Sequence, residues 1–364
     1  SRYCNTGYIG TISLEYNGFK EDCPYTTPET LYLQRKLYKM NRGGVKVVAM
    51  EASSHGLALG RVDSVNFSVA VMTNIGAEHL DFHGTREQYI LAKQKLFEMI
   101  KPSGWVVLNS DDENFLRIKN STKGKILTYG INNQSDVMAK SFRLFLDHSE
   151  FDLSFKGNTY HVSSPVLAKF NIYNVLALVC TLIAMGCDEK MVLQAVKEVK
   201  PVEGRMELIK AKQNFSVIID YCQHINNYEQ IFEFVDSVRQ NKGRLIAVLG
   251  APGKRNYKMR REIGKVANKY LDHVILTQLD DRGENVYDIC KTIQAEIVDI
   301  SSVIIPSRQV AIEQAIEIAC KDDIILILGK GHEKFISLEV GHVDYPGDST
   351  IVKEAIGRIY GEND

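Results

Sequence analysis

The chain has 364 residues, of which 45% are hydrophobic and 24% charged, so it can bury the cores of two or three domains. Lysine plus arginine (44) nearly balance aspartate plus glutamate (45), and the resulting net charge of −1 excludes a strongly basic nucleic-acid-binding protein. The longest apolar run, at 175–185, is too short to cross a bilayer, and the first residues lack a signal-peptide pattern. Seven widely spaced cysteines without a CxxC pair indicate reduced thiols, so we expect a cytoplasmic protein with no membrane span and no nucleic-acid partner.

Short apolar strands alternate with helical stretches in the first part of the chain. The runs 46–51 and 68–73 are mostly β-branched or small and apolar, which is typical of fully buried parallel strands. A helical pattern at 86–100 and a strand at 105–109 follow, and this βαβ order predicts a mostly parallel sheet. Alternating apolar and polar residues between 137 and 161 then predict antiparallel hairpins, with helices at 174–185 and 190–199.

The helical pattern stops at Pro201 and Gly204, which we interpret as a boundary between two α/β domains, 1–204 and 205–364. A second βα series follows this boundary. Its predicted strands lie at 216–220, 245–250, 273–277 and 323–328, and its predicted helices at 228–239, 259–270, 285–297, 309–320 and 350–360.

Polar residues follow the ends of the first two predicted strands. Glu51 closes one strand, and the other leads through Asn74 to His79. Because ligands bind at the carboxyl ends of parallel strands, a carboxylate and an imidazole there could hold a divalent cation. The alternative is that both side chains only cap or pair locally.

Lys93 and Asn171 lie in predicted helices and have simple structural explanations as well. A lysine on an amphipathic helix is usually solvated, and the spacing does not distinguish Lys93 from Lys95. Asn171 or Asn174 could cap the helix that begins near them, although an amide could also recognise an adenine edge.

Three turns of the second domain carry charged residues after strands. The turn at 250–255 joins glycines to Lys254 and Arg255 before a helix, which favours an anion site or a solvated basic turn. The turn at 329–333 holds a lysine, a histidine and a glutamate on a flexible backbone. With Asp280, Asp281 and Arg282 on the same sheet edge, it could bind a zwitterionic amino acid, unless these are surface charges only.

Together these segments resemble the Mur ligase family, in particular its members that add a diamino acid. The resemblance runs from about Tyr8 to the C-terminus, and its most specific segments are 25–29, 50–62, 73–85, 92–93, 170–171, 204–207 and 329–333. It implies an α/β fold with a central P-loop-NTPase-like, mostly parallel sheet domain, incomplete at its N-terminus, followed by a Rossmann-like C-terminal domain. It also implies a monomeric, ATP- and Mg²⁺-dependent ligase of peptidoglycan precursor synthesis. Such an enzyme adds meso-diaminopimelate or L-lysine to UDP-N-acetylmuramoyl-L-alanyl-D-glutamate through an acyl phosphate.

The resemblance also implies roles for individual residues. Catalysis and Mg²⁺ binding are expected of Glu51, His79 and Lys93, the last as a carbamylated side chain. ATP is expected to bind at Asn74, Asn171, Arg205 and Asp220. The residues expected to bind the nucleotide-linked dipeptide are Thr26, Thr27, Ser53 and Ser54, and those expected to bind the amino acid are Arg260, Arg282, Gly329 and Glu333.

The chain departs from the family pattern in ways that leave alternatives open. The glycine-rich phosphate loop ending in Gly-Lys-Thr/Ser is absent, so either the chain is a fragment or it is a degenerate homologue that binds or regulates without chemistry. Ala168 stands where a glycine usually precedes the Phe-Asn pair, and of an Asp-Asn-Pro-Arg motif only Arg282 is clearly kept. This arginine slightly favours diaminopimelate over lysine. A related ligase acting on folate or a poly-amino acid is a weaker alternative.

Overall fold

Two compact units make up the chain, and the computed structural model describes residues 4–76, 78–210, 213–239 and 242–361. Unit 1 comprises Ser1–Phe142, Phe151–Val162 and Ile172–Val196, and unit 2 comprises Arg143–Glu150, Ser163–Asn171 and Lys197–Asp364. Within the described residues, no helix is both long and apolar enough to cross a membrane. The predicted domain boundary after residue 204 stays a prediction.

Unit 1 contains two sheets, and the sequence pattern, which predicts a mostly parallel sheet followed by antiparallel hairpins, does not indicate this division. The first has the strand order β3-β2-β1-β4 and consists of β1 (Thr6–Ile9), β2 (Leu14–Tyr16), β3 (Phe19–Glu21) and β4 (Val47–Met50). The second has the order β10-β9-β8-β7-β6-β5 and consists of β5 (Val69–Met72), β6 (Trp105–Asn109), β7 (Lys125–Gly130), β8 (Val137–Leu144), β9 (Ser149–Phe155) and β10 (Asn158–Ser164). β1 and β4 pair in parallel, as do β5, β6, β7 and β8 in sequence.

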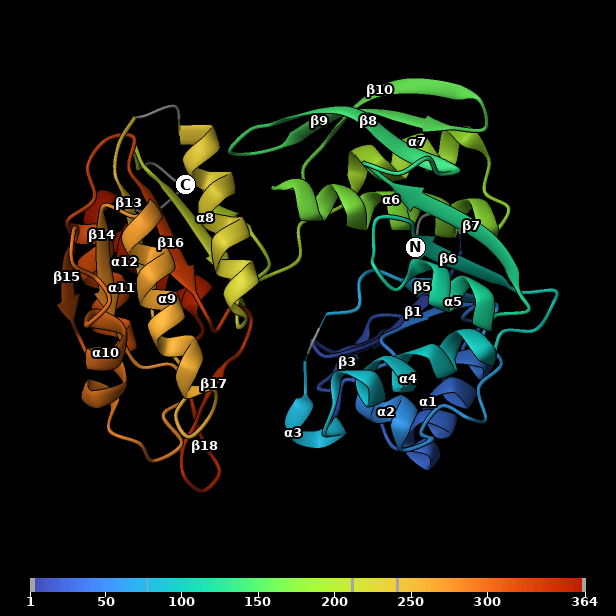
Figure 1. The fold of residues 1–364 in the computed structure, drawn as a ribbon, viewed down its shortest axis with the longest axis horizontal. Coiled ribbons are helices and arrows are strands. Elements are labelled where there is room, and N and C mark those ends of the chain that lie inside the picture. The colour runs from blue at the N-terminus through green and yellow to red at the C-terminus, as the bar shows by residue number, and fades with distance from the viewer. Residues whose placement is uncertain (1–3, 77, 211–212, 240–241, 362–364) are drawn as a thin grey trace. The chain divides into compact units, whose positions relative to one another are not determined.

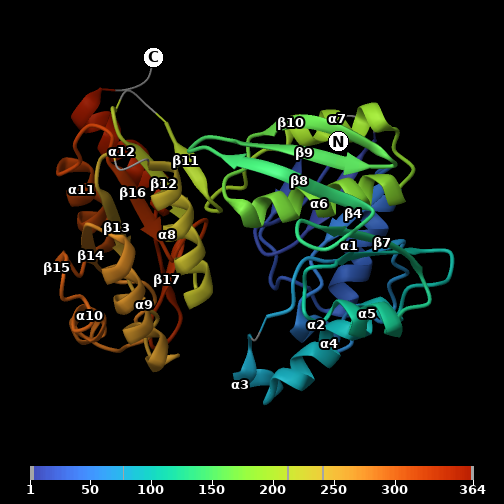
Figure 2. The ribbon, with the colours of Figure 1, turned by 45° about the horizontal axis from the view of Figure 1, so that its top comes forward.

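Helices cover the strands of unit 1. They are α1 (Thr30–Arg42), α2 (Ser54–Ala58), α3 (Leu80–His83), α4 (Arg86–Glu98), α5 (Phe115–Ser121), α6 (Lys169–Ala184) and α7 (Glu189–Glu198). Helix α4 begins where the Thr85 side chain accepts a hydrogen bond from the backbone N–H of Gln88, at 3.2 Å. Figures 1 and 2 show α4 and α5 next to each other, and Figure 1 shows β5 and β6 beside α5.

Unit 2 is a doubly wound sheet of the order β11-β12-β16-β13-β14-β15, in which all strands but β11 run parallel. The strands are β11 (Glu207–Ile209), β12 (Ser216–Asp220), β13 (Leu245–Leu249), β14 (His273–Leu276), β15 (Ser301–Ile304) and β16 (Ile324–Leu328), with the separate hairpin β17 (Phe335–Ser337) and β18 (His342–Asp344). The helices are α8 (Ile225–Arg239), α9 (Tyr257–Tyr270), α10 (Val286–Gln294), α11 (Arg308–Glu317) and α12 (Asp348–Tyr360).

Alternate residues of the central strands build the two cores of unit 2. In β13, Leu245, Ala247 and Leu249 pack into a core with α8, α9 and α10. Ile246 and Val248 of the same strand point to the opposite core, which α11 and α12 close (Figure 1). The prediction of an α/β fold with parallel sheets is therefore confirmed.

Ala168 adopts a backbone conformation that suits glycine. Its φ is +69° while its side chain is buried, and a left-handed conformation costs a non-glycine residue about 1–2 kcal/mol. We expect Ala168→Gly to raise the free energy of unfolding by up to about 1 kcal/mol, because relief of this strain exceeds the added entropy of the unfolded chain. Urea unfolding measures this change. The control Ala267→Gly, inside helix α9, should instead lower stability by about 1 kcal/mol, and equal losses in both variants would contradict the prediction.

Candidate functional site

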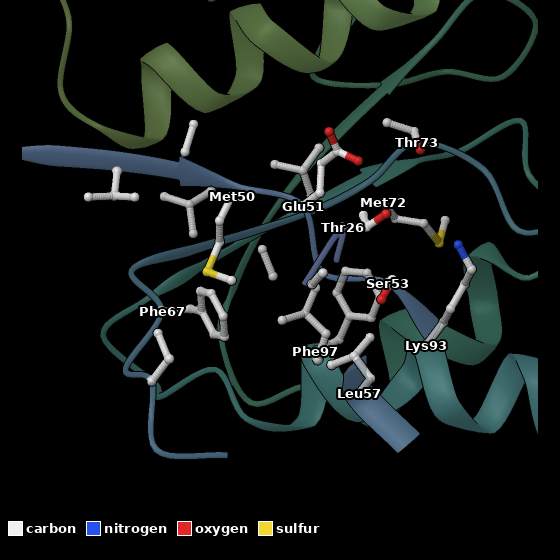
Figure 3. Close-up of a pocket in the computed structure, with 18 of the residues that line it drawn as sticks. Thr26, Met50, Glu51, Ser53, Leu57, Phe67, Met72, Thr73, Lys93 and Phe97 are labelled. Carbon is white, nitrogen blue, oxygen red and sulfur yellow. The ribbon is translucent and has the colours of Figure 1, made fainter. Parts of the chain in front are cut away.

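A cavity of about 1130 Å³ in unit 1 collects most of the side chains predicted there (Figure 3). It lies along β4 and β5 and reaches the loops that follow these strands. The predicted residues that line it are Thr26, Glu51, Ser53, Ser54, Asn74, His79 and Lys93. Figure 3 shows Glu51, Thr73 and Lys93 toward the same end of this cavity. The carboxyl ends of the two parallel strands therefore carry the candidate site.

Glu51 is held in place by Tyr8 of β1 and by Thr11 in the loop between β1 and β2. The Tyr8 hydroxyl donates to Glu51 Oε1 at 2.5 Å, and the backbone N–H of Thr11 donates to the same oxygen at 3.1 Å. The Thr11 hydroxyl donates to Oε2 at 2.7 Å. Burial and the neighbouring Glu51 carboxylate raise the pKa of Tyr8, so the phenol stays a proton donor. These bonds fix the direction of the carboxylate before any cation binds.

Lys93 lies on the side of α4 that faces the cavity rather than solvent. Its Nζ lies 5.1 Å from the centroid of the Tyr89 ring. Desolvation lowers the pKa of Lys93, and the carboxylates of Glu78 and Asp112 only partly oppose this shift. Lys95, two residues along, instead pairs with Asp63 at 2.7 Å. The structure thus distinguishes the two lysines that the sequence spacing leaves equivalent, and a neutral Lys93 amine is the form that carbamylation requires.

His79 belongs to a cluster of aromatic rings around α3. Its ring centroid lies 4.7 Å from that of His55, which in turn lies 4.1 Å from Phe82 and 5.5 Å from His83. Desolvation and the neighbouring His79 lower the pKa of His55, which keeps its imidazole neutral near pH 7. His79 itself has a positive φ of 54°, an uncommon conformation that turns its side chain at the start of α3.

The four residues predicted to contact the nucleotide-linked dipeptide have different surroundings. The fully buried Thr27 hydroxyl donates to the Glu51 carbonyl at 2.7 Å and accepts from the Ser53 N–H at 2.8 Å. Ser53 caps α2 by accepting from the Gly56 N–H, and the Ser54 hydroxyl lies 3.0 Å from Nε2 of His83. Thr26 bonds to Thr11 at 3.0 Å. In this conformation the hydrogen bonds of Thr27 and Ser53 fix the loop between β4 and α2. Thr26, Ser53 and Ser54 line the cavity, and Thr27 does not.

The donor set around this cavity suits Mg²⁺. The described residues contain no cluster of three or more His, Cys, Asp or Glu side chains able to enclose a metal ion. Mg²⁺ does not require such a cage, because it is commonly held by one or two carboxylates with waters and substrate phosphates. Glu51, His79 and a carbamylated Lys93 would supply such an incomplete set.

The charged turns of unit 2 converge on one buried lysine. Lys330 has no exposed surface, and its Nζ lies 3.0 Å from Oδ1 of Asp280 and 2.5 Å from Oε2 of Glu333. The Tyr221 hydroxyl donates to the other Glu333 oxygen at 3.1 Å. Burial raises the pKa of Glu333, although the Lys330 ammonium opposes this shift. Gly329, with a φ of +110°, makes the turn possible, since a Cβ there would lie 2.7 Å from Leu279.

The two arginines predicted to recognise the amino acid differ in how they are paired. Arg260 is buried and forms a bidentate ion pair with Glu284, at 2.6 and 2.7 Å, so its charge is already matched. Arg282 lies 3.6 Å from Asp280, and its buried Nη1 has no hydrogen-bond partner among the described residues. Arg282 is therefore the better candidate to bind a substrate carboxylate, while Arg260 supports the loop.

The ion pair between Arg260 and Glu284 makes the stability of the fold depend on pH. Hydrogen bonds from Arg260 lower the pKa of Glu284 to about 2 from its ordinary value of 4.5. A lowered pKa stabilises the fold above pH 4.5, and this stabilisation is lost as the pH falls through 2. We expect Glu284→Gln to reduce the loss of unfolding free energy between pH 4.5 and 2, measured by urea unfolding at each pH. Parallel pH profiles for the two proteins would contradict this.

The four residues predicted for ATP lie on different elements. Asn74 lines the unit 1 cavity, whereas Asn171 donates to the carbonyl of Leu167 at 2.9 Å and so closes the first turn of α6. Arg205 is exposed and stacks on Tyr221 at 4.5 Å. Asp220 is buried and accepts the backbone N–H groups of Met206 and Cys222, both at 2.8 Å. The Asp220 carboxylate thus fixes the segment that presents Arg205.

Two turns of unit 2 touch each other at a glycine. A Cβ built on Gly253, in the turn between β13 and α9, would lie 1.7 Å from the carbonyl oxygen of Asp281. The backbone N–H of Gly253 donates to the carbonyl of Asp280 at 2.7 Å. Only glycine allows this approach, because any side chain would overlap the neighbouring backbone.

Sequence reasoning missed several residues that shape the two clusters. Tyr8 and Thr11 lie far from Glu51 in the chain, and only the pairing of β1 with β4 brings them together. The sequence places Lys330 and Asp280 in charged turns, but nothing in its pattern indicates that the lysine is fully buried. Tyr221 directly follows β12, which ends at Asp220. This position at the end of a parallel strand is a sequence signal that could have identified Tyr221 as a candidate site residue.

Comparisons with known proteins place these features in a family. The Mur ligase middle domain matches residues 2–182, and the Mur ligase, glutamate ligase domain matches residues 204–331. The chain is 38% identical over 355 residues (97% of this chain, 72% of the relative) to UDP-N-acetylmuramoyl-L-alanyl-D-glutamate–2,6-diaminopimelate ligase of Caldanaerobacter subterraneus. It is 36% identical over 366 residues to the Bacillus cereus protein of the same name, covering 98% of this chain and 74% of that one.

Solved structures give the same picture of the fold. A structure of UDP-N-acetylmuramoyl-L-alanyl-D-glutamate–2,6-diaminopimelate ligase aligns with a TM-score of 0.70 and 27% identity over 99% of this chain and 74% of its own. Folylpolyglutamate synthase of Thermotoga maritima aligns with a TM-score of 0.67 over 90% of this chain and 80% of its own, at 16% identity, a likeness of fold alone.

Proposed function

Because this chain belongs to the Mur ligase family, we propose that it adds a diamino acid to UDP-N-acetylmuramoyl-L-alanyl-D-glutamate at the expense of ATP, in peptidoglycan precursor synthesis. The diamino acid we propose is 2,6-diaminopimelate, which the names of both reported relatives contain. The observation that carries the proposal is the cavity of unit 1, which Glu51 at the end of β4, His79 in the loop after β5 and Lys93 of α4 line together.

The first step we propose is transfer of the γ-phosphoryl group of ATP to the free glutamate carboxylate of the dipeptide, which gives an acyl phosphate and releases ADP. A bound Mg²⁺ would neutralise charge on the phosphate oxygens. Glu51, fixed by Tyr8 and Thr11, would hold this ion together with His79 and the carbamate of Lys93. Desolvation lowers the pKa of Lys93, which supports the carbamate because only a neutral amine reacts with carbon dioxide.

The second step is attack of the diamino acid on the acyl phosphate, with loss of phosphate and formation of the amide. The charged turns of unit 2 offer both signs of charge for a zwitterion. The unpaired Nη1 of Arg282 would receive a carboxylate of diaminopimelate, and Asp280 and Glu333 would lie near an ammonium group. L-lysine lacks the second carboxylate, so this arrangement favours diaminopimelate.

Phosphate release tests the function. The full chain is incubated with ATP, Mg²⁺ and UDP-N-acetylmuramoyl-L-alanyl-D-glutamate, with meso-diaminopimelate, with L-lysine or with no amino acid. We expect phosphate and the tripeptide product with diaminopimelate, and little of either in the other two reactions. Absence of product with every diamino acid would contradict the proposal. It would indicate a ligase-derived protein that binds without catalysis. The two relatives, which match nearly the whole chain and are named as ligases, do not favour this alternative.

A further inference from the structure

Positive charge is concentrated in helix α1 of unit 1 and in the segment that follows it. From Thr30 to Met50 the chain has five lysine and arginine residues (35, 36, 39, 42 and 46) and no aspartate or glutamate, although the whole chain has a net charge of −1. Four of these five cations belong to α1 itself. A helix of this composition attracts anionic partners.

Most of the cations of α1 are available to a partner outside the chain. Lys36 forms an ion pair with Glu21 of β3, and its hydrogen bond is the main cause that lowers the pKa of Glu21. The charge of Lys39 contributes to the same shift from a greater distance. Arg35 and Arg42 are exposed and form no ion pair with any residue that the structure describes. At least two guanidinium groups of α1 therefore have no counter-charge of their own.

Large apolar side chains lie in the same row as these arginines. Leu31 is 75% exposed and Tyr38 is 66% exposed, whereas Leu33 and Met40 of α1 are fully buried in the core of unit 1. The residues at 31, 35, 38 and 42 follow the i, i+4, i+7, i+11 spacing of one side of a helix, over about 16 Å. We call these four residues the α1 stripe. It alternates apolar and cationic side chains on the solvent side of the helix.

This alternation suits an anionic bilayer better than a protein or a soluble polyanion. The core of a protein interface is contiguous and poor in charge, whereas arginines separate the two apolar side chains of the stripe. A soluble polyanion would contact the cations and leave Leu31 and Tyr38 in water. At a bilayer surface, leucine and tyrosine side chains enter the interfacial layer, and lysine and arginine side chains reach the lipid phosphates. Both kinds of side chain then find a partner.

We propose that the α1 stripe, together with Lys39, docks unit 1 on the surface of a bilayer that contains anionic phospholipids. The three cations Arg35, Lys39 and Arg42 near the surface correspond to a preference of about 100-fold for anionic over neutral bilayers. The docking is peripheral, since no helix of the described residues can cross a membrane. This inference concerns where the protein lies, and it stands whether or not the chain has ligase activity.

Sedimentation of the full chain with lipid vesicles tests the proposal. One set of vesicles contains phosphatidylglycerol and phosphatidylcholine in equal amounts, and the other contains phosphatidylcholine alone. We expect the protein to partition onto the anionic vesicles about 100-fold more strongly at 0.1 M NaCl. Most of this binding should be lost at 1 M NaCl, because the screening length falls from about 10 Å to about 3 Å. Equal partitioning onto both sets of vesicles, or none onto the anionic set, would overturn the proposal.

Three double variants locate the binding surface, and each replaces exposed side chains only, so the fold should persist. Arg35→Gln/Arg42→Gln should weaken binding to the anionic vesicles about 30-fold. Leu31→Ser/Tyr38→Ser should weaken it at least about tenfold without any change of charge. The matched control, Lys119→Gln/Lys123→Gln, removes the same charge at helix α5 and should bind nearly as the native protein does.

The variants also distinguish the bilayer from other partners. An equal loss in the control and in Arg35→Gln/Arg42→Gln would show that overall charge alone drives binding, and would overturn the proposal. Unchanged binding of Leu31→Ser/Tyr38→Ser would identify a purely electrostatic site for a polyanion, and would overturn it as well. Soluble poly-glutamate that displaces the protein from the vesicles at an equal concentration of charge would identify an acidic protein as the partner instead.

Discussion

Replacing Asp348 by alanine is expected to lower the free energy of unfolding by about 3–5 kcal/mol, because it leaves the Arg308 guanidinium buried without its counter-charge. Arg308 Nε donates to Asp348 Oδ1 at 2.8 Å and Nη2 donates to Oδ2 at 2.7 Å, and both side chains have almost no exposed surface. Tyr345 donates to the same carboxylate at 2.6 Å. The pair connects the first turns of α11 and α12.

Urea unfolding measures this loss, and two variants separate the buried charge from other effects. Arg358→Ala removes a solvent-exposed pair with Glu313 and should cost less than about 1 kcal/mol. The double variant Arg308→Met/Asp348→Leu removes both charges and should recover most of the stability lost in Asp348→Ala. A loss below about 1 kcal/mol in Asp348→Ala, or no recovery in the double variant, would contradict the prediction.

Replacing Lys93 by alanine is expected to reduce phosphate release at least about 100-fold, because the substitution removes one of the proposed Mg²⁺ ligands at the phosphoryl-transfer site. The matched control is Lys95→Ala on the same helix, whose amine pairs with Asp63 and should be dispensable for the reaction. Similar rates for the two variants would refute a special role for Lys93.

Carbamylation of Lys93 has a readout that does not depend on activity. With ¹³C-labelled bicarbonate, NMR should show a carbamate carbon in the native protein and in Lys95→Ala, and no such signal in Lys93→Ala. The lowered pKa of Lys93 makes the neutral amine available at a lower pH than for an ordinary lysine. The signal should therefore persist toward neutral pH, and its presence in Lys93→Ala would assign it to another amine.

The periodicity of the sequence predicts the elements whose apolar pattern is local. The strand at 105–109 has the expected bounds, and α8, α9 and α12 begin two or three residues before their predicted starts. The N-terminal strands β1–β3 and helix α1 were not predicted from the sequence, although Leu33, Leu37 and Met40 of α1 recur at helical spacing and pack in one core. The short edge strand β15, with alternating exposed residues, was also missed. Its four residues are too few to give a pattern.

The sequence predicts which side chains follow the strands but not what surrounds them. Glu51 and His79 were identified from their place after β4 and β5, yet the bonds that orient Glu51 come from Tyr8 and Thr11 through long-range pairing. The apolar composition of β4 and β5 predicts burial in a sheet, but composition does not say which strand lies beside each of them. Only the structure shows that β4 pairs with β1 and that β5 pairs with β6.

The contact at Gly253 links two loops that a protein engineer would wish to change separately. We propose that Arg282 binds the amino acid, and the backbone of the turn that carries it rests directly on the glycine of the neighbouring turn. Libraries that vary Arg282 while keeping Gly253 and Asp280 should contain many folded members, whereas libraries that vary Gly253 should contain few. Natural divergence in substrate choice would face the same restriction, and the two turns would have to change together.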